Sequence, residues 1–113
     1  MAAPGTPLER FDRAIGAYLE ALAAEPAFAR LFMVEVYAAG DKVLERRAEI
    51  QQRFAELVID ASGARDPTTR FACEALVAAI ITMVTARLAA RDIDGLRALR
   101  KPLTELVRRA LRD

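Results

Sequence analysis

The longest apolar run in the 113-residue sequence extends from Phe71 to Ala86, and Glu74 is the one charged residue within it. The run follows Asp66-Pro67, which has the form of a helix cap followed by a proline in the first helical turn. The predicted helix is apolar on nearly all sides, so it has no face suited to water. It therefore lies at the centre of a larger protein or is covered by a second copy of this chain. A chain of this length favours the second arrangement.

Proline and glycine mark the ends of the preceding helices. Thr6-Pro7-Leu8-Glu9 matches a capping box, which predicts a first helix from there to about Ala24. Pro26 begins a second helix, short and unusually apolar, and we expect Gly40 to end it in the left-handed conformation.

The later helices are bounded in the same way. We expect Asp41 to cap a third, amphipathic helix, which Ser62-Gly63 ends. After the apolar run, Pro102 is expected to separate a short turn of helix from a final helix between about Lys101 and Leu111.

The sequence as a whole predicts an all-α antiparallel bundle of about five helices. Alanine is its commonest residue and valine and isoleucine are few, a balance that favours helix over sheet. We expect residues 1–6 to be a disordered N-terminal segment. Residues 7–113 then form a single helical domain.

Two absences limit the chemistry available to the chain. Histidine does not occur, and Cys73 is the one cysteine. This excludes Ser-His-Asp and Cys-His catalysis, zinc sites made of thiolates or imidazoles, and an internal disulfide. We therefore predict no enzymatic activity, no metal and no cofactor. A small helical enzyme that works through arginine and glutamate alone is the weakest alternative, because most arginines fall on predicted solvent faces.

The net charge of +1 predicts no direct binding of nucleic acid and no membrane partner, since both need an excess of clustered cations. The start of the chain lacks the pattern of a signal peptide, so we expect a cytoplasmic protein. One basic cluster occurs near the C-terminal end, but acidic residues are interspersed in it and we predict a solvated helix face. Its members are Arg97, Arg100, Lys101, Arg108, Arg109 and Arg112.

The apolar run and the last helix together predict a homodimer. Small residues on the run allow helices to approach closely, so two copies can form a four-helix interface. The alternative is that the same residues pack inside one chain. The predicted interface residues are Ala75, Ala79, Ile80, Met83, Val84, Leu103, Leu106 and Val107.

The segment from Tyr18 to Val58 resembles the ligand-binding half of TetR-type transcriptional regulators. It reads YLEALAAEPAFARLFMVEVYAAGDKVLERRAEIQQRFAELV, which is similar to a YLEALAAEP, then LLLVE, then AAG pattern. The segment from Phe71 to Arg91 and the PLTELV sequence also suit the last two helices of that family. The resemblance implies an effector-binding and dimerisation domain without the helix-turn-helix unit that reads DNA in such regulators.

The resemblance further implies a pocket for a small apolar or amphipathic effector among the first four helices. Bulky, adaptable side chains are the candidates to line it, because methionine and aromatic residues adjust to varied ligands. They are Tyr18, Phe28, Phe32, Met33, Tyr37, Phe54 and Met83. Two alternatives stay open: these side chains simply fill the core, or the chain is a ligand-free helical module for protein–protein interaction and assembly.

Overall fold

The structure, a computed structural model, describes residues 5–35, 40–63 and 66–112, and the regular secondary structure in this part of the chain is all helical. The all-α prediction is confirmed, with α5 a short turn of helix between longer ones. In chain order the helices are α1 Pro7–Ala24, α2 Pro26–Met33, α3 Asp41–Ser62, α4 Pro67–Ala89, α5 Ile93–Arg97 and α6 Arg100–Arg112.

The predicted capping residues of α1 and α4 are confirmed. The Thr6 hydroxyl accepts a hydrogen bond from the backbone N–H of Glu9 at 3.2 Å, and the Glu9 carboxylate accepts one from the backbone N–H of Thr6 at 3.0 Å. Asp66 caps α4 by accepting from the backbone N–H of Thr69 at 2.9 Å. These contacts satisfy donors that the first turn of a helix leaves unpaired. Gly63 ends α3 in the left-handed conformation, as expected.

Two expectations around the second helix are wrong. α2 ends at Met33, several residues before Gly40, and Gly40 instead precedes α3 with φ 106° and ψ 173°. Asp41 is the first residue of α3 and not its side-chain cap. Glycine suits this backbone conformation because it has no Cβ to clash, and Gly40 serves here as the N-cap of α3.

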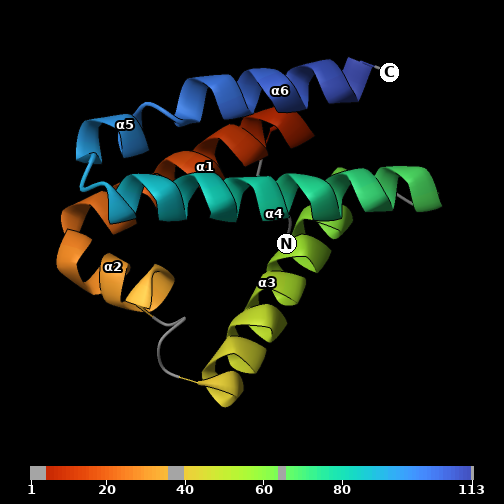
Figure 1. The fold of residues 1–113 in the computed structure, drawn as a ribbon. Helices are drawn as coiled ribbons and strands as arrows, with labels where there is room; N and C mark the ends of the chain where they lie inside the picture. The colour runs from red at the N-terminus through yellow and green to blue at the C-terminus, as the bar shows by residue number, and fades with distance from the viewer. Residues whose placement is uncertain (1–4, 36–39, 64–65, 113) are drawn as a thin grey trace.

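The core joins α1, α4, α5 and α6, and α2 contributes Ala29 to it. α6 runs back antiparallel to α1 and α4, while α3 lies obliquely across one end of α4 (Figure 1). The residues buried in this core recur every three or four positions along α1 and α4, so each helix turns one stripe inward. They are Ile15, Leu19, Ala23, Ala29, Ile80, Val84, Leu88, Leu96, Leu99 and Leu103.

Two arginines fix α1 to the C-terminal helices. Arg100 donates from Nε and Nη2 to the two carboxylate oxygens of Asp12, each at 3.0 Å, and Thr104 donates to the same carboxylate. Arg97 pairs with Glu20 at 2.9 Å. Paired N–H donors on a carboxylate define both distance and orientation, so these contacts set the register of α1 against α5 and α6.

α4 is long and apolar enough to cross a membrane by length and composition, with 28% of its most apolar window buried in the fold. Core helices of other proteins pass the same test. Here α4 packs against α2, α3 and α5, and Val77, Ile80 and Val84 on it are buried. The helix therefore serves as the central element of this fold.

Candidate functional site

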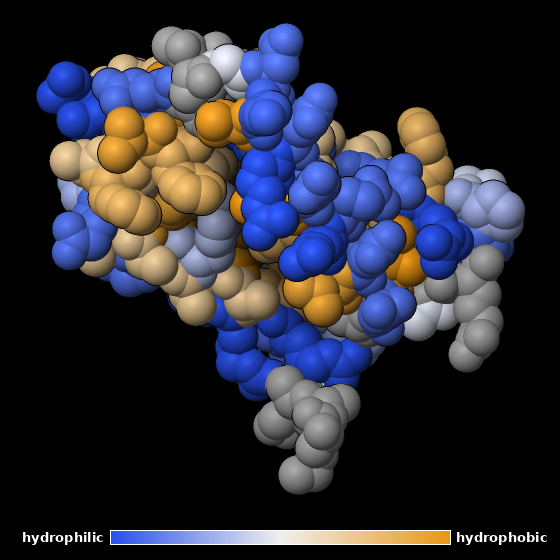
Figure 2. All heavy atoms as spheres, turned by 90° about the horizontal axis from the view of Figure 1, so that it is seen from below, coloured by the Kyte–Doolittle hydropathy of each residue, from blue (hydrophilic) through white to orange (hydrophobic). Residues whose placement is uncertain are grey.

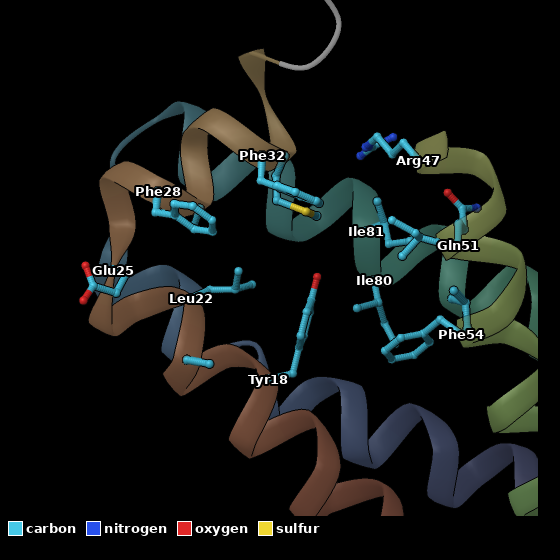
Figure 3. A pocket seen from close by; sticks show the side chains of 15 residues that line it. Tyr18, Leu22, Glu25, Phe28, Phe32, Arg47, Gln51, Phe54, Ile80 and Ile81 are labelled. Carbon is cyan, nitrogen blue, oxygen red and sulfur yellow. The ribbon is translucent and has the colours of Figure 1, made fainter. Parts of the chain in front are cut away.

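A cavity of about 280 Å³ lies between α1, α2, α3 and α4, and we call it the α1–α4 pocket (Figure 3). Its surface is almost entirely apolar. Ligand sites in proteins are typically concave and apolar with a few polar groups, and their volumes begin at about 300 Å³. The lining residues are Tyr18, Ala21, Leu22, Glu25, Phe28, Ala29, Phe32, Met33, Arg47, Ile50, Gln51, Phe54, Val77, Ile80 and Ile81.

The pocket exists because α3 packs on α4 without covering α2. Tyr18 of α1 and Phe54 of α3 meet with ring centroids 6.0 Å apart and planes tilted by 57°. This geometry is typical of favourable aromatic pairs. Val77 and Ile80 of α4 also line the pocket. The pocket is thus closed at the place where α1 and α3 approach each other, and α4 lines it with apolar side chains.

α2 forms the other wall. Its Phe28 and Phe32 lie one helical turn apart and stack with ring centroids 6.2 Å apart. Both rings remain largely exposed, by 64% and 53%, as does Leu31 beside them. Figure 2 shows apolar side chains gathered at the end of the molecule where α2 lies. Exposed aromatic rings beside a cavity present apolar area that a bound molecule would cover.

Three polar side chains interrupt the apolar lining on the side of α1 and α3. The Tyr18 hydroxyl points into the cavity, and the Arg47 side chain extends over it from α3, near Gln51 (Figure 3). Burial raises the pKa of Tyr18, while the positive charge of Arg47 acts on that pKa in the opposite direction. The phenol therefore stays neutral at pH 7 and can donate a hydrogen bond. Arg47 also donates to the Thr85 hydroxyl at 3.5 Å.

Most of the predicted pocket residues line this cavity, namely Tyr18, Phe28, Phe32, Met33 and Phe54. The prediction for Met83 is wrong, because α4 turns Ile80 and Ile81 to the pocket and leaves Met83 on its outer side, 40% exposed. Tyr37 lies outside the described residues. Our prediction missed Arg47 and Gln51, whose long polar side chains gave no sign of lining an apolar cavity.

The predicted dimer interface divides into two groups. Ala75, Ala79, Met83 and Leu106 lie on the surface, where Leu106 is 50% exposed and Ala79 is half-buried. The prediction is wrong for the other four, because the core of one chain already covers their side chains. These are Ile80, Val84, Leu103 and Val107, with exposed fractions from 0% to 9%.

The outer side of α4 is a continuous face without charge. Successive turns place apolar or small residues on it, and Glu74 and Arg87 lie at its edges. We call it the α4 outer face, and in Figure 1 α4 crosses in front of α1 and α3. A wide apolar face that none of the described helices covers is unusual in a monomer and typical of an interface. Its members are Phe71, Ala75, Ala78, Ala79, Thr82, Met83 and Ala86.

A shallow, open hollow of about 380 Å³ continues this face toward the C-terminal helices. It lies between the end of α4, α5 and the start of α6, with Ala86, Leu99 and Pro102 among its lining residues. Unlike the α1–α4 pocket it is broad and mixed in polarity. Its shape therefore suits a protruding side chain of another protein surface better than an enclosed small molecule.

The basic cluster of the C-terminal region is largely compensated by carboxylates. Besides the two pairs with α1, Arg108 and Arg109 contact Glu105 at 3.0 and 3.4 Å. Such exposed pairs leave little net positive field for phosphate groups. Within residues 5–35, 40–63 and 66–112, no group of three or more acidic or cysteine side chains is placed to hold a metal ion, and Cys73 is buried.

Comparison with known proteins gives no match: no family model matches the chain, and no curated protein or solved structure resembles it significantly.

Proposed function

We propose that this chain is the effector-binding and homodimerisation domain of a TetR-like regulator, with the α1–α4 pocket as the effector site. The observation that carries the proposal is the apolar cavity formed jointly by four helices, which five of the residues expected from the resemblance line. In this proposal the helices described here sense and dimerise, and a separate unit reads DNA.

The proposed dimer uses a second copy of this chain as the cover of the α4 outer face. Small residues such as Ala75 and Ala79 let two helices approach closely. The same face on two copies is complementary to itself around a two-fold axis, and the lack of charge on it removes the usual cost of burial. Leu106 on α6 and the adjoining hollow extend the area toward the C-terminal helices.

The position of α4 suggests how the two sites communicate. Ile80 and Ile81 on one side of α4 line the pocket, and Ala79 and Met83 on the other side belong to the proposed interface. An effector that binds better to one position of α4 than to another shifts the dimer between two arrangements. An effector with equal affinity for both arrangements would leave the equilibrium between them unchanged.

Calorimetric titration of the full chain with octanol tests the pocket, because octanol is apolar and uncharged. We expect saturable binding to the wild type and at least about tenfold weaker binding to Ala21→Trp, whose indole would occupy the pocket. Ala14→Trp is the matched control, since Ala14 is exposed on α1 two turns away and does not line the pocket. Equal octanol affinity in both variants, or no binding to the wild type, would overturn the proposal.

A ligand-free module for protein–protein interaction is the second candidate function. The observation in its favour is the exposure of Phe28, Leu31 and Phe32 on α2, which is high for large apolar side chains. The same titration separates the two functions. A module that uses α2 as a docking surface would bind no octanol in the α1–α4 pocket, and Ala21→Trp would leave its stability unchanged.

A further inference from the structure

We propose that the ligand of the α1–α4 pocket is an amphipathic carboxylate, with its apolar body against α2 and α4 and its anionic group toward Arg47 and Tyr18. This inference rests on the proposed function, since it assigns a chemical class to the effector of that site. It follows from where polar groups occur in a cavity that is otherwise apolar.

The polar groups are gathered on one side of the pocket. Arg47 and Gln51 lie one turn apart on α3, and Tyr18 turns its hydroxyl toward the cavity from α1 (Figure 3). The opposite wall, built from Phe28, Phe32 and their neighbours on α2, is apolar. A ligand that matches this distribution has one polar end and one apolar end.

The charge of the polar end follows from the two ionised side chains among the described lining residues. Arg47 is half-buried and extends over the cavity, whereas Glu25 is exposed and points away from it (Figure 3). A guanidinium presents several N–H donors in a plane that matches a carboxylate. The neutral Tyr18 hydroxyl adds a donor, and both groups favour an anion over a cation.

The hydrogen bond from Arg47 to Thr85 directs the guanidinium from α3 toward α4. At 3.5 Å the hydrogen bond uses Nη2 and involves a neutral hydroxyl. Arg47 is half-buried, so an ion pair between it and a ligand carboxylate would form in partly dry surroundings, where it is stronger than in water. The small volume of the cavity favours a medium-length alkyl chain or a single aromatic ring as the apolar body.

Comparison of octanoate, octanol and octylamine by calorimetric titration of the wild type tests the inference. The three probes share one apolar body and differ in the charge of the head group. We expect octanoate to bind at least about tenfold more tightly than octanol, the usual gain from hydrogen bonds to a charged group. Octylamine is expected to bind most weakly, because its ammonium would lie near Arg47.

Variants on α3 then assign the preference to Arg47. Arg47→Gln is expected to remove the octanoate preference and to change octanol affinity by less than about threefold, since the apolar contacts stay. Arg47→Lys is expected to keep part of the preference for octanoate, because lysine keeps the positive charge but lacks the planar set of N–H donors that matches a carboxylate. Arg53 is an exposed arginine of α3 outside the pocket, so Arg53→Gln is the matched control. This variant is expected to keep the full preference for octanoate.

The possible outcomes separate this inference from the proposed function. Equal affinity for octanoate and octanol in the wild type overturns the carboxylate and leaves the apolar pocket standing. Tighter binding of octylamine than of octanoate and octanol also overturns the carboxylate assignment, and it indicates that Glu25 contacts the ligand. Absence of binding by all three probes overturns both the inference and the proposed function. Because the wild-type comparison needs no variant, a folding defect in Arg47→Gln does not affect it.

Discussion

The guanidinium of Arg100 lies directly over Gly16 of α1, so that a Cβ built on Gly16 would stand 2.7 Å from Arg100 Cζ. The same guanidinium makes its two hydrogen bonds to Asp12, one turn earlier on α1. A glycine in the middle of a helix is unfavourable in itself. Its presence here gives Arg100 room to cross α1 and reach Asp12.

Gly16→Ala is therefore expected to disconnect Arg100 from Asp12 with a small net gain in stability. Alanine favours a helix interior over glycine by about 1 kcal/mol, and the new methyl group displaces only the mobile end of an exposed side chain. Urea unfolding should show a free energy raised by at most about 1 kcal/mol. In the Gly16→Ala background, Asp12→Asn should then lower the free energy of unfolding by less than it does in the wild type. A loss of stability would mean that the helix backbones meet too closely at Gly16.

Stability is expected to fall on acidification below about pH 4, the ordinary range of carboxyl groups. The hydrogen bonds from Arg100 and Thr104 lower the pKa of Asp12, and those from Arg97 lower that of Glu20. A carboxyl whose pKa is lower in the folded state stabilises the fold above its unfolded pKa, and this contribution disappears as pH falls through the folded pKa. Urea midpoints measured from neutral pH to about pH 3 should decrease less for Asp12→Asn than for the wild type. Identical pH profiles for the two proteins would show that Asp12 does not contribute to the loss of stability at low pH.

The ends of the helices were predictable because they depend on local chemistry. Thr6, Asp66 and Gly63 act through hydrogen bonds or backbone angles within their own turn, and the structure places all three as expected. Gly40 was misread because a glycine with positive φ suits the start of α3 as well as the end of α2. The sequence does not distinguish the two uses.

Which side of α4 is buried and which is exposed was not predictable, for a related reason. A helix that is apolar all round has no polar stripe to mark its solvent side, so Ile80 and Val84 could not be told from Ala75 and Met83. Which of them is covered depends on the packing of α2, α3 and α5 against α4 and on the core that α4 shares with α1. Arg47 was missed because its charge suggested solvent, although its long apolar stem lets it line a pocket.

Ala75→Arg is expected to convert a dimer into a monomer without unfolding it. Ala75 is exposed on the α4 outer face, and an arginine on each copy would bury unpaired like charges in the interface. Dimer affinity should fall by at least about a hundredfold. Light scattering should report twice 12.4 kDa for the wild type and 12.4 kDa for Ala75→Arg at micromolar concentration.

Leu57→Arg is the matched control for the dimer. Leu57 is 68% exposed on α3, away from the α4 outer face, so the same change of charge there should leave the dimer intact. A wild-type monomer at micromolar concentration would contradict the proposed interface, and so would a dimer that survives Ala75→Arg.

Isoleucine methyl NMR shows whether a small apolar molecule binds between α1, α2, α3 and α4. Ile50, Ile80 and Ile81 line the pocket, whereas Ile15 and Ile93 do not. On titration with octanol we expect saturable shifts of the three pocket methyl signals, with those of Ile15 and Ile93 unchanged. Uniform shifts of all isoleucine signals, or shifts confined to Ile15 and Ile93, would contradict binding between these helices.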